Sequence, residues 1–323
     1  MVAASALHCG LHRKVSAIMV SKRLKSDARA HMKAHPGISY QEALRAVTGD
    51  GAEPGMEYST NDLIDLLAVF GITESDAEDL PRVWERNSGT ATLRAPYAHD
   101  VDGDGQLTLD LCEKNLGGDG AHAAVIGPTG CGKSTLLRSL VLGLALLYGP
   151  DKVSLVLGDF KGRNTFHAMD KLPHVMSVIS NLENDQEAQH RLTDFIAEEV
   201  DRREALILSQ PDCKGVHEYR RRHHRDPDCA PTPLPYMVVV LDELSEWGAS
   251  FQLRRALEQL GRVGRVLGIH LVLSSQRLDR DTLGRLCEQL ESVLHLQSPP
   301  QQQVLVAEES ASILVEHLSR YRA

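Results

Sequence analysis

One short stretch restricts the folds open to this chain more than any other feature. Residues 127–135 satisfy the spacing Gly-x-x-x-x-Gly-Lys-Ser/Thr, which is the phosphate-binding loop of nucleoside triphosphatases. Glycines in such a loop let main-chain N–H groups turn inward, because a Cβ there would block the approach of a phosphate. The sequence therefore predicts a nucleotide site. Its expected binding residues are Gly127, Pro128, Thr129, Gly130, Cys131, Gly132, Lys133, Ser134 and Thr135.

Two side chains of this loop are expected to take part in the chemistry. Lys133 can reach the β- and γ-phosphates of ATP, and the hydroxyl of Ser134 can bind Mg²⁺. The surrounding sequence supports this role, because residues 122–126 are typical of a short buried strand and residues 133–148 of a mostly apolar helix. The loop is thus expected at a strand–loop–helix corner, with ATP and Mg²⁺ as cofactors.

Buried strands alternate with helices along the rest of the chain. Strands are expected at residues 122–126, 153–157, 175–179, 236–241, 269–275 and 292–296. Long helices are expected at residues 133–148, 183–209 and 251–267. Several of the strands are apolar on both faces, which indicates a parallel sheet covered by helices. The fold class predicted is therefore α/β, with an open and mostly parallel sheet.

Polar residues follow two of these strands and are candidates for catalysis. Asp242 is expected to hold Mg²⁺ through water, and Glu243, directly after it, stands where a water-activating base would be. Catalytic groups at the carboxyl ends of strands suit a parallel sheet. Gln276, which follows Ser275 at the end of the next strand, is a candidate sensor of the γ-phosphate. It could equally be an ordinary polar residue at a strand end.

Arg262 and Arg265 are candidate arginine fingers on the helix at 251–267. They would act on the nucleotide of a neighbouring subunit if the protein forms a ring. Each could equally be a solvated residue on the surface of a helix. We therefore place them with Lys133, Glu243 and Gln276 as catalytic candidates whose roles depend on geometry.

Net charge, cysteine spacing and the length of apolar runs limit the kinds of protein that this chain can be. The 323 residues carry a net charge of −9, which argues against a protein that coats nucleic acid over its whole surface. The six cysteines contain no Cys-x-x-Cys pair, which fits reduced thiols in the cytosol. No apolar run is long enough to span a bilayer and no signal peptide is evident, so we expect no membrane insertion and a cytoplasmic protein.

An Asp/Gly-rich turn resembles part of a calcium-binding loop. Asp100, Asp102, Asp104 and Gly105 stand at the correct positions, but position 12 is Leu111 where a bidentate Glu is required. Asp and Gly are also what a β-turn favours. Calcium binding is therefore rejected in favour of a turn between strands near residues 93–95 and 107–111.

The first part of the chain differs in character from the rest. Residues 1–55 are expected to be a small helical extension with a linker at 48–55, and residues 56–323 a single ATPase domain. Two short helices are expected in residues 19–47, and a further helix follows the cap at Ser59 as far as Phe70. Translation is hypothesised to start at Met19. Basic residues between Lys22 and Lys33 fit a solvated helical face or a contact with nucleic acid.

Several motifs together resemble one known family. They are Gly127–Thr135, the Asp-Phe-Lys-Gly run at 159–162, Leu-Pro-His-Val at 172–175, Leu-Asp-Glu-Leu-Ser at 241–245 and the run 268–277. In this order and spacing they resemble the FtsK/SpoIIIE family of hexameric motor ATPases, and within it the EccC ATPases of type VII secretion. The resemblance covers roughly residues 57–306. It implies a RecA-like core, ATP hydrolysis and a hexamer-like homo-oligomeric ring.

The same resemblance implies partners. An EccC-like protein would work in protein export with a secretion membrane complex and small helical protein substrates, at the inner face of the cell membrane. A DNA translocase of the FtsK or conjugative-transfer kind shares the same core, and the basic run Arg220–Arg225 leaves room for contacts with phosphates. A nucleotide-gated assembly subunit is the third alternative. DNA-stimulated, salt-sensitive turnover would separate the second from the others.

Overall fold

The computed structural model describes residues 31, 33, 60–100, 106–162, 165–244, 249–278, 283–297, 302–304, 306 and 308–322. The chain divides into two compact units, residues 1–74 and 75–323, and each is considered by itself. The expected helices within 19–47, the linker at 48–55, the start at Met19 and most of the calcium-like turn lie outside the described residues. The domain boundary at 55/56 stays a prediction.

The first unit contains helix α4 (Thr60–Val69). It falls where the sequence predicts a helix up to Phe70. Leu67 has no exposed surface and Phe70 is 3% exposed, so these two apolar residues face inward. The helix closes in a turn at Gly71, whose φ of +77° is a left-handed conformation that glycine adopts without steric cost. Helix α5 (Glu74–Ala77) follows.

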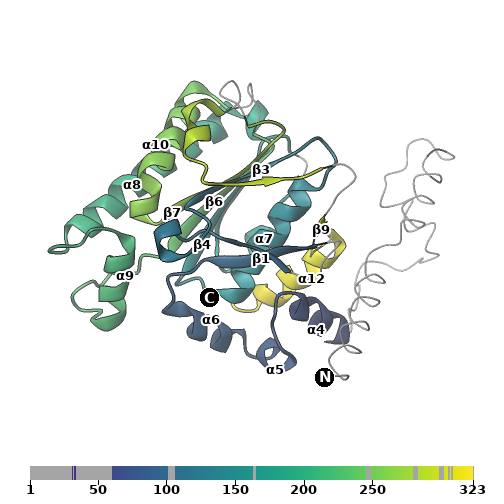
Figure 1. Ribbon diagram of the computed structural model, residues 1–323, viewed down its shortest axis with the longest axis horizontal. Helices are drawn as coiled ribbons and strands as arrows, with labels where there is room; N and C mark the ends of the chain where they lie inside the picture. The colour runs from purple at the N-terminus through teal and green to yellow at the C-terminus, as the bar shows by residue number, and fades with distance from the viewer. Residues whose placement is uncertain are drawn as a thin grey trace. The chain divides into compact units, whose positions relative to one another are not determined.

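The second unit is built on a sheet of six parallel strands (Figure 1). Their spatial order is β5–β4–β6–β7–β3–β8. The strands are β3 (His122–Ile126), β4 (Val153–Asp159), β5 (Val175–Ser180), β6 (Tyr236–Asp242), β7 (Ile269–Ser275) and β8 (Ser292–His295). The expected α/β class and parallel sheet are confirmed.

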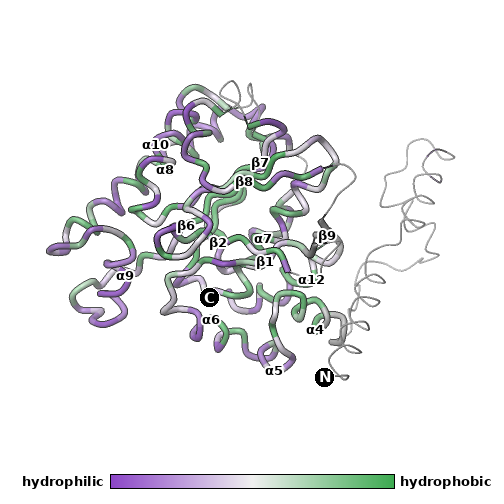
Figure 2. The backbone as a smooth tube through the Cα atoms, in the orientation of Figure 1, coloured by the Kyte–Doolittle hydropathy of each residue, from purple (hydrophilic) through white to green (hydrophobic). Residues whose placement is uncertain are grey.

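Burial explains why these segments form strands. Every residue of β3, β4, β6 and β7 is buried, whereas the outer strands β5 and β8 are partly exposed. Strands covered on both faces need continuous apolar sequence, and Figure 2 shows hydrophobic residues along the centre of the sheet. The register places Asp159 of β4 beside Asp242 of β6, so polar groups gather at the carboxyl edge.

Helices cover both faces of the sheet. On one side α8 (Gln186–Leu208) packs against α10 (Phe251–Leu267), which also contacts β7. On the other side α7 (Lys133–Leu147) contacts the sheet and is flanked by α12 (Glu308–Ser319) (Figure 1). None of the described helices is both long and apolar enough to cross a bilayer.

A second, antiparallel sheet packs against α7. Its order is β2–β1–β9, with β1 (Arg94–Asp100), β2 (Gln106–Asp110) and β9 (Gln302–Val304). Helix α6 (Leu80–Ser88) precedes β1 and also contacts α7. The remaining elements are α9 (Val216–Arg225) and the 3₁₀ turns η1 (Lys114–Leu116), η2 (Met169–Lys171), η3 (Leu182–Asn184) and η4 (Gly284–Glu288).

Candidate nucleotide site

The loop after β3 is held in a tight turn against its neighbours. The main-chain N–H of Gly127 donates to the carbonyl of Ser275 at the end of β7, at 3.2 Å. A Cβ on Gly127 would lie 2.6 Å from the carbonyl oxygen of Leu296 and 2.7 Å from Sγ of Cys131, so a larger residue does not fit. Gly130 and Gly132 have φ of +83° and +99°, which only glycine adopts readily.

Lys133 begins helix α7 and is turned into the loop. Its Nζ donates to the carbonyl oxygens of Gly127 at 2.8 Å and Pro128 at 3.0 Å, and the residue is only 3% exposed. Ser134 and Thr135 occupy the first turn of the same helix and are partly exposed. The unpaired N–H groups and the dipole of a helix N-terminus attract phosphate. The loop therefore offers an ammonium, a hydroxyl and main-chain donors at one point.

Asp242 ends β6 with both carboxylate oxygens hydrogen-bonded. Oδ2 accepts from the hydroxyl of Thr165 at 2.6 Å, and Oδ1 accepts from the hydroxyl of Ser274 on β7. The residue is 1% exposed. A buried carboxylate needs such donors, because an unpaired charge in the interior is costly. These contacts fix the orientation of the carboxylate.

Glu243 has an unusual backbone. Its φ is +56°, in the left-handed region that few non-glycine residues occupy. The conformation is held by Ser274, whose Oγ accepts from the N–H of Glu243 at 2.8 Å and whose carbonyl accepts from the N–H of Leu244 at 2.9 Å. The carboxylate oxygen Oε2 lies 3.6 Å from Nζ of Lys161.

Gln276 joins the third strand of the site to the loop. Its Nε2 donates to the hydroxyl of Thr129 at 3.2 Å. Strand β7 lies between β6 and β3, so it separates the carboxylates from the phosphate loop and contacts both. Lys133, Asp242, Glu243 and Gln276 are thus brought to the carboxyl edge of three neighbouring strands.

The two arginines predicted as fingers lie elsewhere in the chain. Arg262 and Arg265 are exposed on the C-terminal half of α10, which ends at Leu267 just before β7 begins at Ile269. The phosphate loop contacts the opposite end of β7, at Ser275. Neither arginine is therefore placed to act on the nucleotide of its own chain, and a role in trans stays a prediction.

Several groups at the site were not assigned from sequence. The carboxylate of Asp159 caps the turn after β4, with Oδ1 accepting from the N–H groups of Lys161 and Gly162, both at 3.0 Å, and Oδ2 from that of Thr165 at 3.2 Å. Thr165 and Ser274 in turn hold Asp242. Asp159 could have been found from sequence, because like Asp242 it is an acidic residue at the end of an apolar strand. No sequence pattern marks Thr165 or Ser274 as part of the site.

The donor chemistry at this edge fits a magnesium ion held together with a nucleotide. Mg²⁺ prefers oxygen ligands and keeps several waters, so proteins often supply only one or two groups. Ser134 offers a hydroxyl and Asp242 a carboxylate whose oxygens retain lone pairs beyond their hydrogen bonds. Within the described ranges, no group of three or more His, Cys, Asp and Glu side chains could hold a metal without help from other ligands.

The basic run near residue 220 is only partly a solvated surface. Residues 212–235 are polar, basic and contain proline, which predicts a surface excursion, but the segment contains α9, with Val216 and Tyr219 buried. Arg220 Nη1 donates to the carbonyl of Leu234 at 2.8 Å, and its guanidinium lies 4.7 Å from the centre of the Tyr236 ring. This arginine packs within the fold, which weakens the case for a nucleic-acid contact through this run.

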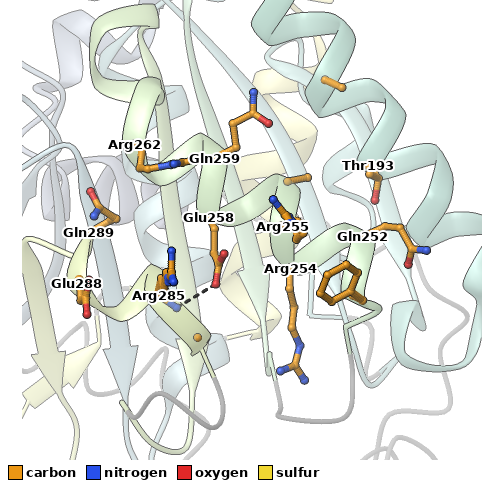
Figure 3. Close-up of a pocket in the computed structure, with 14 residues that line it drawn as sticks. Thr193, Gln252, Arg254, Arg255, Glu258, Gln259, Arg262, Arg285, Glu288 and Gln289 are labelled. Atoms are coloured by element: carbon orange, nitrogen blue, oxygen red, sulfur yellow. Dashed lines mark hydrogen bonds between the residues drawn. The ribbon is translucent and has the colours of Figure 1, made fainter.

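A cavity lies between α8, α10 and η4, and no residue of the phosphate loop lines it (Figure 3). Its volume is about 900 Å³. Arginine side chains at 254, 255, 262 and 285 line it, together with Glu258 and Glu288. Within the described part of the chain, none of these four guanidinium groups forms an ion pair. The cavity, called the arginine groove below, is therefore a site of positive charge on an acidic protein.

Comparison with known proteins agrees with this geometry. The model of the FtsK/SpoIIIE family matches residues 81–280, which span the phosphate loop, Asp242, Glu243 and Gln276. The chain belongs to the FtsK/SpoIIIE family.

Relatives place the chain near one branch of that family. It is 36% identical over 225 residues to the ESX-5 secretion system protein EccC5 of Mycobacterium tuberculosis, which covers 67% of this chain and 16% of that protein. It is 32% identical over 218 residues to the type VII secretion system protein EssC of Staphylococcus aureus, covering 67% and 14%. The chain thus spans only a small part of the length of these relatives.

A solved structure supports the same relationship. The cytoplasmic domain of the Thermomonospora curvata type VII secretion ATPase EccC matches with a TM-score of 0.62 and 36% identity, over 71% of this chain and 26% of that one. The chain is therefore an FtsK/SpoIIIE-type ATPase domain homologous to EccC. The DNA-translocase alternative is not favoured by these relatives.

Proposed function

We propose that this chain binds MgATP at residues 127–135 and hydrolyses it to ADP and phosphate. The observation that carries the proposal is that hydrogen bonds link the carboxyl ends of three neighbouring strands, β3, β7 and β6. Gly127 is bonded to Ser275, Thr129 to Gln276, and Ser274 to Asp242. The phosphate loop, Asp242 and Gln276 are then held relative to one another before a substrate binds.

The residues have separable roles in this proposal. Lys133 neutralises charge on the β- and γ-phosphates, and Ser134 with Asp242 holds Mg²⁺, which supplies further neutralisation when bound. Glu243 orients a water and accepts its proton, while Gln276 contacts the transferred group from β7. The buried position of Glu243, 8% exposed, limits competing contact with solvent.

Turnover and binding measured separately test the proposal. Lys133→Ala is expected to weaken binding of a fluorescent ATP analogue and to abolish turnover. Glu243→Gln is expected to keep binding and lose turnover, because it removes only the base. Retained turnover in Glu243→Gln would overturn the assigned mechanism. Weak binding in both variants would indicate that the glutamine had disturbed the loop instead.

We further propose that this activity serves protein export and that the chain acts in a homo-oligomeric ring. Its homology to EccC proteins supports the first part, and the position of Arg262 and Arg265 away from their own loop supports the second. Turnover per subunit should then rise with protein concentration. In Arg262→Ala or Arg265→Ala, turnover per subunit should rise less with protein concentration, while nucleotide binding stays unaltered. In the same proposal, the protein acts at the inner face of the cell membrane, together with a membrane complex.

The arginine groove is our candidate for contact with an exported substrate. One relative, ATPases 2 and 3 of Thermomonospora curvata EccC, has been solved in complex with a signal sequence peptide. In this chain four arginines and the exposed ring of Phe251 line one cavity, and none of the four forms an ion pair with another described residue. Such a surface suits an acidic peptide with apolar anchors. Stimulation of turnover by duplex DNA, lost at high salt, would instead favour the DNA-translocase alternative.

A further inference from the structure

The turn after β4 is tied to the carboxylates of the nucleotide site by several contacts. Asp159 caps the turn through the N–H groups of Lys161, Gly162 and Thr165. The hydroxyl of Thr165 donates to Asp242. The N–H of Phe160 donates to the carbonyl of Asp242 at 3.1 Å. The described residues of this turn are therefore held at the end of β6.

Lys161 carries a positive charge in the described part of this turn. Its Nζ lies 3.6 Å from Oε2 of Glu243, with 28% of the lysine side chain and 8% of the glutamate side chain exposed. The pair is more shielded from water than an ordinary surface ion pair, so its attraction is screened less. A charge that contacts the expected base of the reaction must affect where that base stands.

Sheet order shows which way the lysine draws the glutamate. Lys161 follows β4 and the phosphate loop follows β3, and these strands lie on opposite sides of β6 in the order β4–β6–β7–β3. The ion pair thus ties Glu243 to the side away from Lys133. The left-handed backbone of Glu243 is held by Ser274, so a change in the position of its carboxylate would come from rotation of the side chain.

We propose that Lys161 is a positioning residue that restrains Glu243 on the β4 side, and that turnover requires this ion pair to open. This inference deepens the proposed ATP hydrolysis and rests on it. When the pair opens, the carboxylate can turn toward the phosphate loop, where it orients water. The turn after β4 then becomes a point at which a neighbouring subunit or a substrate could regulate turnover.

Substitutions at Lys161 test the restraint through kcat. Lys161→Gln removes the charge, so kcat should rise about three- to tenfold, while the affinity for a fluorescent ATP analogue stays unchanged. Lys161→Arg keeps the charge and should behave as the wild type. Lys171→Gln, at an exposed lysine that follows on the same segment, is the matched control for loss of one positive charge.

The outcomes distinguish two failures. If Lys161→Gln is no faster than the wild type while Glu243→Gln is inactive, the restraint is wrong and the proposed base stands. If Glu243→Gln turns over like the wild type, the proposed base itself is wrong. A fall in kcat for Lys161→Gln with normal binding would mean that the lysine positions Glu243 productively, which also overturns the restraint.

A cross-linking measurement decides the matter even if no preparation turns over ATP. A carbodiimide joins an amine and a carboxylate only when they are in contact, and mass spectrometry of tryptic peptides can measure the Lys161–Glu243 product. Its yield in the full chain should fall several-fold when a non-hydrolysable ATP analogue and Mg²⁺ are added. In Lys133→Ala the yield should not change. An undiminished yield in wild-type protein that has bound the analogue would overturn the proposal.

Discussion

Ser274 and Asp242 form a hydrogen bond between neighbouring strands, with the serine hydroxyl donating to Oδ1 of the carboxylate. The same serine oxygen accepts from the N–H of Glu243 at 2.8 Å, and the serine has no exposed surface. One hydroxyl on β7 thus sets both the orientation of the expected metal-binding carboxylate and the backbone of the expected base.

Ser274→Ala should therefore impair catalysis more than folding. Loss of a group that orients a metal-binding carboxylate typically costs about 10- to 100-fold in activity or metal affinity. The unpaired N–H of Glu243 should lower the free energy of unfolding by about 1–3 kcal/mol. Steady-state turnover over a range of Mg²⁺ concentrations and urea unfolding measure the two effects. Ser319→Ala, whose hydroxyl donates only within its own helix, is the control. Equal turnover in the two variants would contradict the role of Ser274.

Gly127 is predicted to tolerate no side chain. The Cβ of Gly127→Ala would meet the carbonyl oxygen of Leu296 at 2.6 Å and Sγ of Cys131 at 2.7 Å, so the loop or β8 must shift. We expect loss of binding of a fluorescent ATP analogue and a decrease of about 1–3 kcal/mol in the free energy of unfolding, as is usual for overpacking.

Gly89→Ala is the matched control for this substitution. Gly89 lies after α6 with φ of −79°, and nothing lies within 4 Å of its Cβ position. Its replacement should leave nucleotide binding unchanged and the stability within about 0.5 kcal/mol of the wild type. A Gly127→Ala variant that binds nucleotide like Gly89→Ala would show that the loop is less constrained than its contacts indicate.

The sheet could be predicted from sequence because its information is local. Strands β3, β4, β6 and β7 are apolar on both faces, a pattern that few other structures produce. The phosphate loop is likewise specified by the spacing of its own residues. Strand order is not local, so nothing in the sequence alone places β7 between β6 and β3.

The same distinction explains which site groups were missed. Thr165 and Ser274 both bind Asp242, from which they lie 77 and 32 positions away along the chain. Only the folded sheet brings these residues together. The helix α9 was missed because its charged residues dominate the segment, whereas two buried residues, Val216 and Tyr219, anchor it. Long-range packing, not local preference, decides such elements.

The buried ammonium of Lys152 should make stability depend on pH. Its Nζ donates to the carbonyls of Asn87 at 2.6 Å and Thr90 at 2.9 Å, and the residue has no exposed surface. Burial, together with the positive charge of Arg220, lowers the pKa of Lys152 to about 7 in the folded protein. Between this value and the ordinary lysine pKa of 10.5, the unfolded chain binds more protons at this residue than the folded one. Stability from this residue therefore increases as the pH rises through that window.

Lys152→Met removes this dependence. Relative to the variant, the wild type should gain up to about 1.4 kcal/mol of unfolding free energy per pH unit between pH 7 and 9. Urea unfolding at several pH values measures the difference, in which contributions from other titrating groups cancel. Lys171→Met, at an exposed lysine, should show the same dependence of unfolding free energy on pH as the wild type. A constant offset between wild type and Lys152→Met would contradict the lowered pKa.

Charge reversal in the arginine groove should weaken binding of an acidic peptide. Arg255 and Arg285 line the groove from α10 and η4, and neither guanidinium forms an ion pair within the described part of the chain (Figure 3). The pair of substitutions Arg255→Glu and Arg285→Glu should raise the Kd of a fluorescein-labelled helical peptide, with glutamates on one face and leucines on the other, by about tenfold or more. Fluorescence anisotropy at low and physiological salt measures this.

Binding through the groove should also depend on salt in the wild type and lose that dependence in the charge-reversed protein, because exposed charges are screened within about 10 Å at 0.1 M salt. Arg82→Glu is the control, since its side chain is 79% exposed and lies outside the groove. ATP turnover without peptide should be the same in all three proteins, because Arg255 and Arg285 do not contact the phosphate loop. If the charge-reversed protein binds the peptide as tightly as the Arg82→Glu control does, the groove is not the peptide site.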